Sequence, residues 1–267
     1  MLTLNNVSAG YEGHDVISNI SLSVAKGENL CVLGPNGCGK TTLIKTISGL
    51  IPHSGTIIIN GINLDSMNRT EVAKNIAVMS QISTIYFSYT VYETVLLGRY
   101  LHMKGNAFKE PSLKDREYAD KCLKAVGLFN CKNKQINTLS GGQLQRVYLA
   151  RTLAQEPNII LLDEPTNHLD LKHQTELIDF LKDWSKIENH TVIGVFHDLN
   201  LAINLADNIL LLDNGKIASY GKTNDVISSK LLNEVYEMDI ANYMLNSLKQ
   251  WECIQEEPRK TKLRKIK

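Results

Sequence analysis

A glycine-rich loop between an apolar strand and a helix constrains this chain more than any other feature. The segment Gly34-Pro35-Asn36-Gly37-Cys38-Gly39-Lys40-Thr41 fits the pattern G-x-x-x-x-G-K-[ST]. An apolar run over 31–33 precedes it, and a helical pattern over 41–48 follows and stops at Gly49. Glycines let backbone N–H groups surround phosphate oxygens, and the helix N-terminus adds partial positive charge. The sequence therefore predicts a strand–loop–helix unit that binds nucleotide phosphates.

Two further elements complete a predicted ATP site with Mg²⁺. Lys40 is expected to reach the β- and γ-phosphates, Thr41 to offer its hydroxyl to Mg²⁺, and Thr42 to donate toward the α-phosphate. An apolar run over 159–162 ends in Asp163, the predicted Mg²⁺-side carboxylate, and Glu164 follows as the candidate general base that orients water. A glycine-rich turn can lack a ligand, and an acid after a strand can be a solvated cap. The two motifs together favour a nucleoside-triphosphatase site.

The hydrophobic pattern divides the chain into β-rich and helical stretches. The first sixty residues read as antiparallel structure, with a hairpin over 56–63 around Asn60-Gly61. Residues 90–137 read as a separate helical lobe. Afterwards, apolar strands alternate with helical segments, which predicts a parallel sheet with helices on its faces. The strands are expected over 159–162, 191–196 and 209–212, and the helices over 142–154 and 171–184.

A pentapeptide narrows the choice among nucleotide-binding proteins. Ser140 and Gln143 in Leu139-Ser140-Gly141-Gly142-Gln143 have capping-box spacing, so the segment is expected to begin a helix. This segment, extended by Leu144-Gln145-Arg146-Val147, strongly resembles the signature of ABC transporter ATP-binding subunits. The resemblance implies that Ser140, Gly142 and Gln143 contact ATP held by a second copy of the chain.

The resemblance covers nearly the whole chain to about residue 240 and implies its domain plan. The fold class is α/β, a P-loop NTPase (RecA-like) core with a parallel sheet, an N-terminal antiparallel β subdomain and an inserted helical subdomain. The ABC ATPase domain is expected over 1–240, with core and β subdomain over 1–85 and 158–240 and the helical subdomain over about 86–157. A C-terminal extension with a basic tail occupies 241–267.

The same resemblance assigns roles to four isolated residues. Tyr11, placed before the first alternating strand, matches the aromatic residue that stacks on adenine. Gln81, after the strand expected over 76–80, matches the glutamine that joins the lobes and senses Mg²⁺ and water. Asp170 is the acid of the loop Pro165-Thr166-Asn167-His168-Leu169-Asp170, which couples two sites. His197 matches the histidine that contacts the γ-phosphate and aligns Glu164 with water. On pattern alone, each has a structural explanation.

Three stretches resemble importers of iron-siderophore, haem and cobalamin. They are Val91-Tyr92-Glu93-Thr94-Val95-Leu96-Leu97-Gly98-Arg99-Tyr100, Leu169-Asp170-Leu171-Lys172-His173-Gln174 and His197-Asp198-Leu199-Asn200-Leu201-Ala202. A proline commonly follows Gly-Arg-x in these importers, whereas Leu101 stands here. The implied partners are a second copy, transmembrane permease subunits and, indirectly, an extracytoplasmic substrate-binding protein.

Composition bears on location and on the excluded classes. No run of eighteen apolar residues predicts a transmembrane helix, and the N-terminus lacks signal-peptide features, so we expect a peripheral protein on the cytoplasmic face of the membrane. The net charge of +1 argues against general nucleic-acid binding, although basic residues gather over 259–267. The five scattered cysteines are expected to be reduced thiols.

Two other functions use the same motifs. An efflux pump would share the ATP site and differ only in its partner. A soluble ABC-type ATPase would have no membrane partner at all. Genes for a binding protein and permease beside this one, or copurification with a membrane protein, would separate these alternatives.

Overall fold

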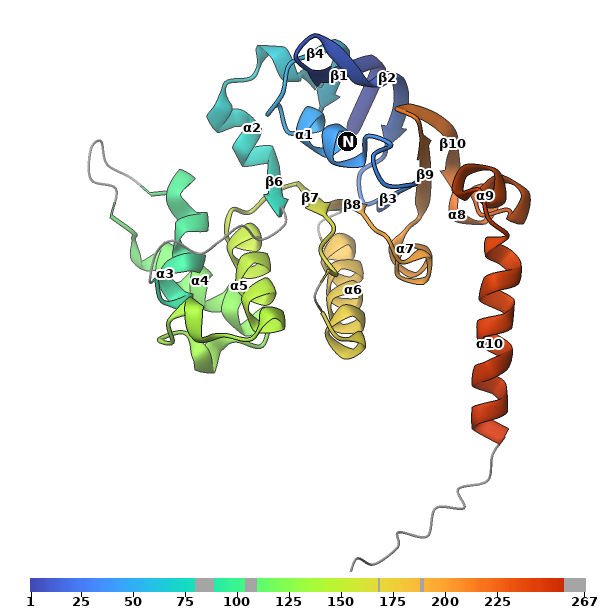
Figure 1. Ribbon diagram of the computed structural model, residues 1–267. Helices are drawn as coiled ribbons and strands as arrows, with labels where there is room; N and C mark the ends of the chain where they lie inside the picture. Colours follow the sequence, from blue (N-terminus) through green and yellow to red (C-terminus); the bar gives the residue numbers. More distant parts are fainter. Residues whose placement is uncertain (80–88, 104–109, 168, 188–189, 257–267) are drawn as a thin grey trace, which may run out of the picture.

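A computed structural model describes residues 1–79, 89–103, 110–167, 169–187 and 190–256 (Figure 1). The described strands form two sheets, one of four strands and one of six. Helices α3, α4 and α5 gather in a lobe beside the six-stranded sheet, and α10 projects away from the body (Figure 1). The arrangement agrees with the α/β class predicted from the sequence.

The four-stranded sheet is antiparallel, in the order β2-β1-β4-β5. Asn60 and Gly61 have φ of 52° and 83°, as a two-residue hairpin turn requires, which confirms the hairpin predicted there. Tyr11 lies before the alternating strand β2, as expected, and is itself the last residue of β1, a strand that the sequence pattern did not single out. A register shift between Leu4 and Val7 breaks the alternation of that strand, which hid it from the sequence pattern. The strands are β1 (Leu2–Tyr11), β2 (His14–Val24), β4 (His53–Ile59) and β5 (Ile62–Asn63).

The six-stranded sheet has the order β10-β9-β3-β8-β7-β6. Its strands pair in parallel, as predicted, except for β10, which was not predicted and runs antiparallel to β9. Asn214 and Gly215 have φ of 45° and 75° and form the tight turn that reverses the chain there. The strands are β3 (Leu30–Leu33), β6 (Ile76–Met79), β7 (Ile159–Asp163), β8 (Thr191–Val195), β9 (Asn208–Asp213) and β10 (Lys216–Lys222).

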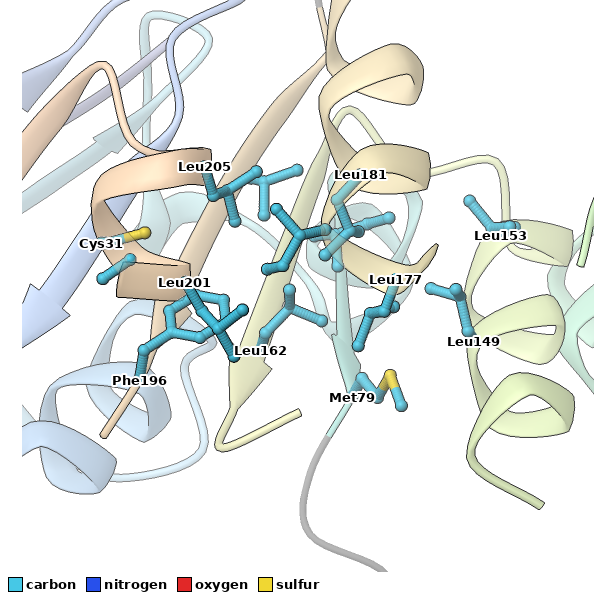
Figure 2. Close-up of a cluster of buried hydrophobic side chains, with 14 of the residues drawn as sticks. Cys31, Met79, Leu149, Leu153, Leu162, Leu177, Leu181, Phe196, Leu201 and Leu205 are labelled. Atoms are coloured by element: carbon cyan, nitrogen blue, oxygen red, sulfur yellow. The ribbon is translucent and has the colours of Figure 1, made fainter. Parts of the chain in front are cut away.

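Two apolar clusters hold the sheets and helices together. Leu43, Ile44 and Ile47 of α1 (Lys40–Ile47) are buried in a cluster that contains residues of both sheets. On the other face, α6 (Leu171–Lys186) and α7 (Leu199–Leu205) contribute leucines to the second cluster, together with α5 (Gly141–Ala154). Figure 2 shows these leucines gathered around Leu162 and Phe196. Helices therefore cover both faces of the central strands, which explains why these strands are almost wholly apolar.

A buried arginine ties the helical lobe together. Arg99 is 6% exposed, and its Nε lies 3.2 Å from Asp115 Oδ1, while its Nη1 donates to Ala154 O at 2.9 Å. These contacts join three segments of the lobe. Its other elements are α3 (Val91–Leu96), α4 (Leu113–Ala125) and the 3-10 turns η2 (Leu97–Leu101), η3 (Phe129–Cys131) and η4 (Ile136–Thr138). Outside the lobe, the 3-10 turn η1 (Leu64–Ser66) contacts β4, and α2 (Arg69–Asn75) contacts β6.

The C-terminal part of the described chain is helical, a feature that the sequence pattern did not predict. It consists of α8 (Thr223–Val226), α9 (Ser229–Tyr236) and α10 (Ile240–Glu256). The basic segment 259–267 lies outside the described residues. Within the described residues no helix has the length and apolar character needed to span a bilayer. Cys31, Cys38, Cys122 and Cys131 are free thiols, as predicted.

Candidate active site

Three adjacent parallel strands bring the predicted ATP-site residues to one edge of the sheet. β8 lies between β3 and β7 in the strand order. The phosphate loop follows β3, Asp163 ends β7, and His197 lies two residues after β8. Because carboxyl ends of parallel strands share one edge, loops after these strands form the crevice in which such sheets bind ligands. The topology alone therefore places these distant sequence segments together.

The phosphate loop has a backbone that requires glycine. Gly34, Gly37 and Gly39 have φ of 146°, 81° and 106°, and a Cβ on Gly34 would lie 2.1 Å from Leu212 O. Lys40 is 5% exposed, and its Nζ donates to Gly34 O at 2.8 Å and to Pro35 O at 2.7 Å. The ammonium group therefore lies within the curve of its own loop, where positive charge and backbone N–H groups can hold phosphates.

The hydroxyl and carboxylate predicted to bind Mg²⁺ are in contact. Thr41 Oγ1 donates to Asp163 Oδ1 at 3.1 Å. Burial raises the pKa of the Asp163 carboxyl, and the negative charge of Glu164 raises it further, against the opposing hydrogen bond from Thr41. A cation would stabilise this carboxylate, and oxygen ligands are those that Mg²⁺ prefers. The described residues contain no group of three or more His, Cys, Asp or Glu that could hold a metal.

Glu164 is held by contacts on both carboxylate oxygens. Its φ is 53°, and its N–H donates to Val195 O at 3.2 Å, which fixes it against the neighbouring strand. Oε1 lies 2.6 Å from His197 Nε2, and Oε2 accepts a 2.6 Å hydrogen bond from Asn167 Nδ2. The Glu164 side chain is 23% exposed, so water can reach it. A fixed, accessible carboxylate of this kind can accept a proton from water.

Asn167 is the site residue that the sequence reasoning missed. The loop 165–170 was recognised, but only Asp170 was given a role in it. The contact arises because Glu164 adopts a left-handed conformation and the loop then turns back, with Asn167 N–H donating to Glu164 O at 3.3 Å. A loop that turns back in this way has no periodic hydrophobic pattern in its sequence. The only signal for Asn167 was therefore the resemblance of the loop 165–170 to the ABC transporter family.

The signature segment begins α5, as predicted. Ser140 Oγ accepts from Gln143 N at 3.3 Å, and Gln143 Oε1 accepts from Ser140 N at 3.2 Å, which completes the capping box. Figure 1 places α5 in the helical lobe and α1 beside the four-stranded sheet. In the described part of the chain, no hydrogen bond joins Ser140, Gly142 or Gln143 to the phosphate loop. Within one chain, the structure does not bring these two groups together.

The remaining predicted residues occupy different positions. Asp170 is the N-cap of α6, and its carboxylate accepts from His173 N at 2.9 Å; this backbone hydrogen bond lowers its pKa. Tyr11 is 45% exposed, and Lys45 Nζ lies 5.9 Å from its ring centroid, so its ring stands beside α1. Thr42 is buried on α1. Gln81 lies outside the described residues, and its predicted role stays a prediction.

Comparison with known proteins agrees with this geometry. The model of the ABC transporter family matches residues 17–167. The petrobactin import ATP-binding protein FpuD of Bacillus anthracis is 36% identical over 239 residues, which cover 89% of this chain and 87% of that protein. The ferric enterobactin transport ATP-binding protein FepC of Escherichia coli (strain K12) is 35% identical over 231 residues, covering 86% of this chain and 84% of that protein.

Solved structures show the same similarity. A metal-chelate type ABC transporter in an inward-facing conformation matches with a TM-score of 0.78 and 30% identity, covering 88% of each chain. An ATP-binding cassette solved as a dimer in a post-hydrolysis state, with ADP and inorganic phosphate, matches with a TM-score of 0.73 and 32% identity. That match covers 83% of this chain and 98% of the other.

Proposed function

The chain belongs to the ABC transporter family of ATP-hydrolysing subunits, and from this premise we propose that it energises import of an iron(III)-siderophore or a related metal chelate. The observation that carries the ATPase function is the Glu164 carboxylate, held at 2.6 Å by both His197 and Asn167 beside the phosphate loop. The cargo rests on similarity to subunits whose names specify petrobactin and ferric enterobactin, and to a metal-chelate type transporter.

The phosphate loop and the residues around it bind ATP in this proposal. Backbone N–H groups over 34–39 surround the phosphates, and Lys40 exchanges its contacts with Gly34 O and Pro35 O for the β- and γ-phosphates. Thr42 donates toward the α-phosphate. Adenine stacks on Tyr11, whose exposed ring lies beside α1. The support is the buried lysine inside a loop in which a Cβ on Gly34 would lie 2.1 Å from Leu212 O and a Cβ on Gly39 would lie 2.6 Å from Ile17 Cγ2.

Thr41 and Asp163 are the residues that would hold Mg²⁺, with Gln81 as a further contributor. These two residues fit the ion because the Thr41 hydroxyl and an Asp163 carboxylate oxygen lie 3.1 Å apart, and because burial raises the pKa of the Asp163 carboxyl, which a cation would offset. When bound with ATP, the ion neutralises phosphate charge that develops during hydrolysis. Removal of Mg²⁺ by EDTA is therefore expected to stop hydrolysis.

Glu164 acts as the general base in the proposed reaction. Its carboxylate orients a water molecule toward the γ-phosphate and takes its proton, while His197 keeps the carboxylate in line and contacts the γ-phosphate. Asn167 holds the second carboxylate oxygen and acts through Glu164, so it is a positioning residue. Because both oxygens already have fixed partners, little reorganisation is needed when ATP and water arrive.

Two copies of the chain form each complete site. Ser140, Gly142 and Gln143 reach ATP on the partner, and Asp170 belongs to the loop that couples the two sites. Support comes from the separation of α5 from α1 within one chain and from the dimeric state of the similar cassette. A lone chain should therefore hydrolyse ATP slowly.

The transport partners follow from the same proposal. The dimer binds transmembrane permease subunits at the cytoplasmic face of the membrane, and an extracytoplasmic binding protein delivers the chelate. Growth of a deletion strain on defined iron sources tests the cargo. We expect poor growth on ferric siderophores, with growth restored by the wild-type gene. Normal growth on every ferric siderophore, haem and cobalamin source would refute metal-chelate import and leave the ATPase function intact.

Removal of the Lys40 ammonium tests ATP binding. Lys40→Ala should abolish measurable ATP binding, because no other described side chain places a positive charge within the curve of the loop. Lys74→Ala, at an exposed position on α2, is the matched control and should bind ATP normally. Unchanged ATP affinity in Lys40→Ala would contradict the proposed site.

A further inference from the structure

A cavity between the helical lobe and α6 lies away from the phosphate loop, since no residue of that loop lines it. It has a volume of about 320 Å³ and lies between the end of α4, α5 and α6. Much of its lining is apolar, with Val126, Leu149, Leu177 and Phe180 among the side chains that face it. Its volume is at the small end of the range for ligand pockets, which are mostly apolar with a few polar anchors. The cavity therefore has the size and lining of a small-molecule site.

A partly buried arginine with one buried, unpartnered N–H group lines this cavity. Arg146 Nε is buried and donates to no acceptor among the described residues, whereas Nε and Nη1 of Arg99 in the same lobe both have partners. A buried guanidinium N–H that lacks an acceptor is unfavourable, and carboxylates match the planar guanidinium best. Arg146 therefore supplies an anchor for an acidic group.

The charged and polar neighbours of Arg146 also bear on the ligand. Glu176 lines the cavity, but its carboxylate lies 3.9 Å from Lys172 Nζ, and no described ion pair joins it to Arg146. His173 lines the cavity as well, and its Nδ1 lies 2.8 Å from Asp170 Oδ1. The buried group that lacks an acceptor is thus a donor of the cation, Arg146 Nε, which favours an anionic ligand over a cationic one.

A second cavity extends the first along α6. It has a volume of about 480 Å³ and shares Ala125 and Phe180 with the first cavity. Trp184 and Leu153 are among its lining residues. Two cavities that meet at an apolar wall suit an elongated ligand better than a compact one, because a chain can follow α6 past Phe180.

We propose that this pair of cavities binds a linear amphipathic carboxylate, with its acidic group on Arg146 and its alkyl chain along Leu149, Leu177 and Phe180. Gly142 and Leu169 also line the first cavity. The ligand would therefore contact both the helix that the signature begins and the loop before α6. Nothing in the ATP site or in the proposed transport cycle uses this ligand.

Calorimetric titration of the full chain with sodium octanoate, below the concentration at which it forms micelles, tests the proposal. We expect saturable binding of one octanoate per chain and weaker binding of octan-1-ol. Arg146→Met should weaken octanoate binding about tenfold or more, because the charge-assisted hydrogen bond is lost. Arg116→Met, which removes an exposed arginine from α4, is the matched control and should bind octanoate as the wild type does.

A second variant allows the proposal to be tested even if Arg146→Met fails to fold. Ala125 is exposed at the junction of the two cavities, so Ala125→Trp should obstruct the cavities while the fold is kept. We expect it to weaken octanoate binding as well. No saturable octanoate binding, equal binding of octan-1-ol, or unchanged affinity in Arg146→Met would overturn the proposal. Tighter binding of octylamine than of octanoate would also overturn it, because it would make Glu176 the anchor.

Discussion

Replacement of Asn167 separates positioning of the general base from binding of ATP. Asn167→Ala removes the 2.6 Å hydrogen bond to Glu164 Oε2 and leaves His197 on Oε1. A hydrogen bond to a charged group contributes about 1.5–3 kcal/mol. Since about 1.4 kcal/mol corresponds to a tenfold change in rate, kcat should fall roughly 10- to 150-fold. The 23% exposure of the Glu164 side chain favours the lower end, because water can replace part of the lost bond.

Steady-state phosphate release by the full chain measures this effect. We expect kcat to fall while KM for ATP stays within about twofold, because Asn167 contacts the carboxylate and not the phosphate loop. Asn167→Asp keeps the shape but replaces the donor by an acceptor, so it should lose as much activity as Asn167→Ala. Gln174→Ala is the control, since Gln174 supports the same loop through Thr166 O at 3.3 Å without touching Glu164. A kcat for Asn167→Ala within twofold of wild type, or an active Asn167→Asp, would refute the positioning role.

Two further predictions concern the backbone of the phosphate loop and the pairing in the helical lobe. Gly34→Ala should lower the unfolding temperature and abolish ATP binding, because its Cβ would lie 2.1 Å from Leu212 O. The Cβ of Gly37→Ala meets nothing within 4 Å, so this variant should cost only about 1 kcal/mol of backbone strain. Equal unfolding temperatures for the two variants would contradict this prediction. Asp115→Asn should lower the free energy of unfolding at pH 7 by about 1.5–3 kcal/mol, because Arg99 Nε loses its carboxylate partner while Nη1 keeps Glu156 at 3.0 Å. Burial raises the pKa of Asp115, but hydrogen bonds from Ser112 and Arg99 outweigh it and hold the pKa below its ordinary value. The ionised Asp115 carboxylate therefore stabilises the fold at pH values above its unfolded-state pKa of about 4. In urea titrations, the difference in free energy of unfolding between Asp115→Asn and wild type should become smaller as the pH falls below that value. A difference that does not change with pH would contradict the assignment.

The sequence predicted those elements for which the local residue preferences and the buried packing favour the same structure. Asn60-Gly61 specified its hairpin because both residues tolerate positive φ, and Ser140 with Gln143 specified the start of α5. β10 was missed although Asn214-Gly215 carries the same hairpin signal. The reason is that β10 is an edge strand with no buried residue, so its hydrophobic pattern is weak. α10 was missed because its described surface contacts little besides α9 and leaves Tyr243, Leu245 and Leu248 exposed.

The candidate site was predictable to the extent that each residue belongs to a local motif. Lys40, Thr41 and Asp163 follow from the phosphate loop and the acidic strand; the structure brings Thr41 into contact with Asp163 and places Lys40 Nζ on Gly34 O. The Asn167 contact could not be predicted, because it depends on a left-handed Glu164 and on the neighbouring strand that holds it. The cavity beside Arg146 likewise depends on how two helices pack, which no spacing in the sequence records.

The central claim is that Glu164 of one chain is the base at a site that two chains complete. Glu164→Gln keeps the shape of the side chain, and its amide can accept from Asn167 while it donates to a neutral His197. ATP should therefore still bind, and light scattering after gel filtration with MgATP should show a stable dimer of the variant. Phosphate release should fall by about 10²- to 10⁴-fold, the range for loss of a general base. Normal turnover in Glu164→Gln, or a variant that stays monomeric with saturating ATP, would contradict the account.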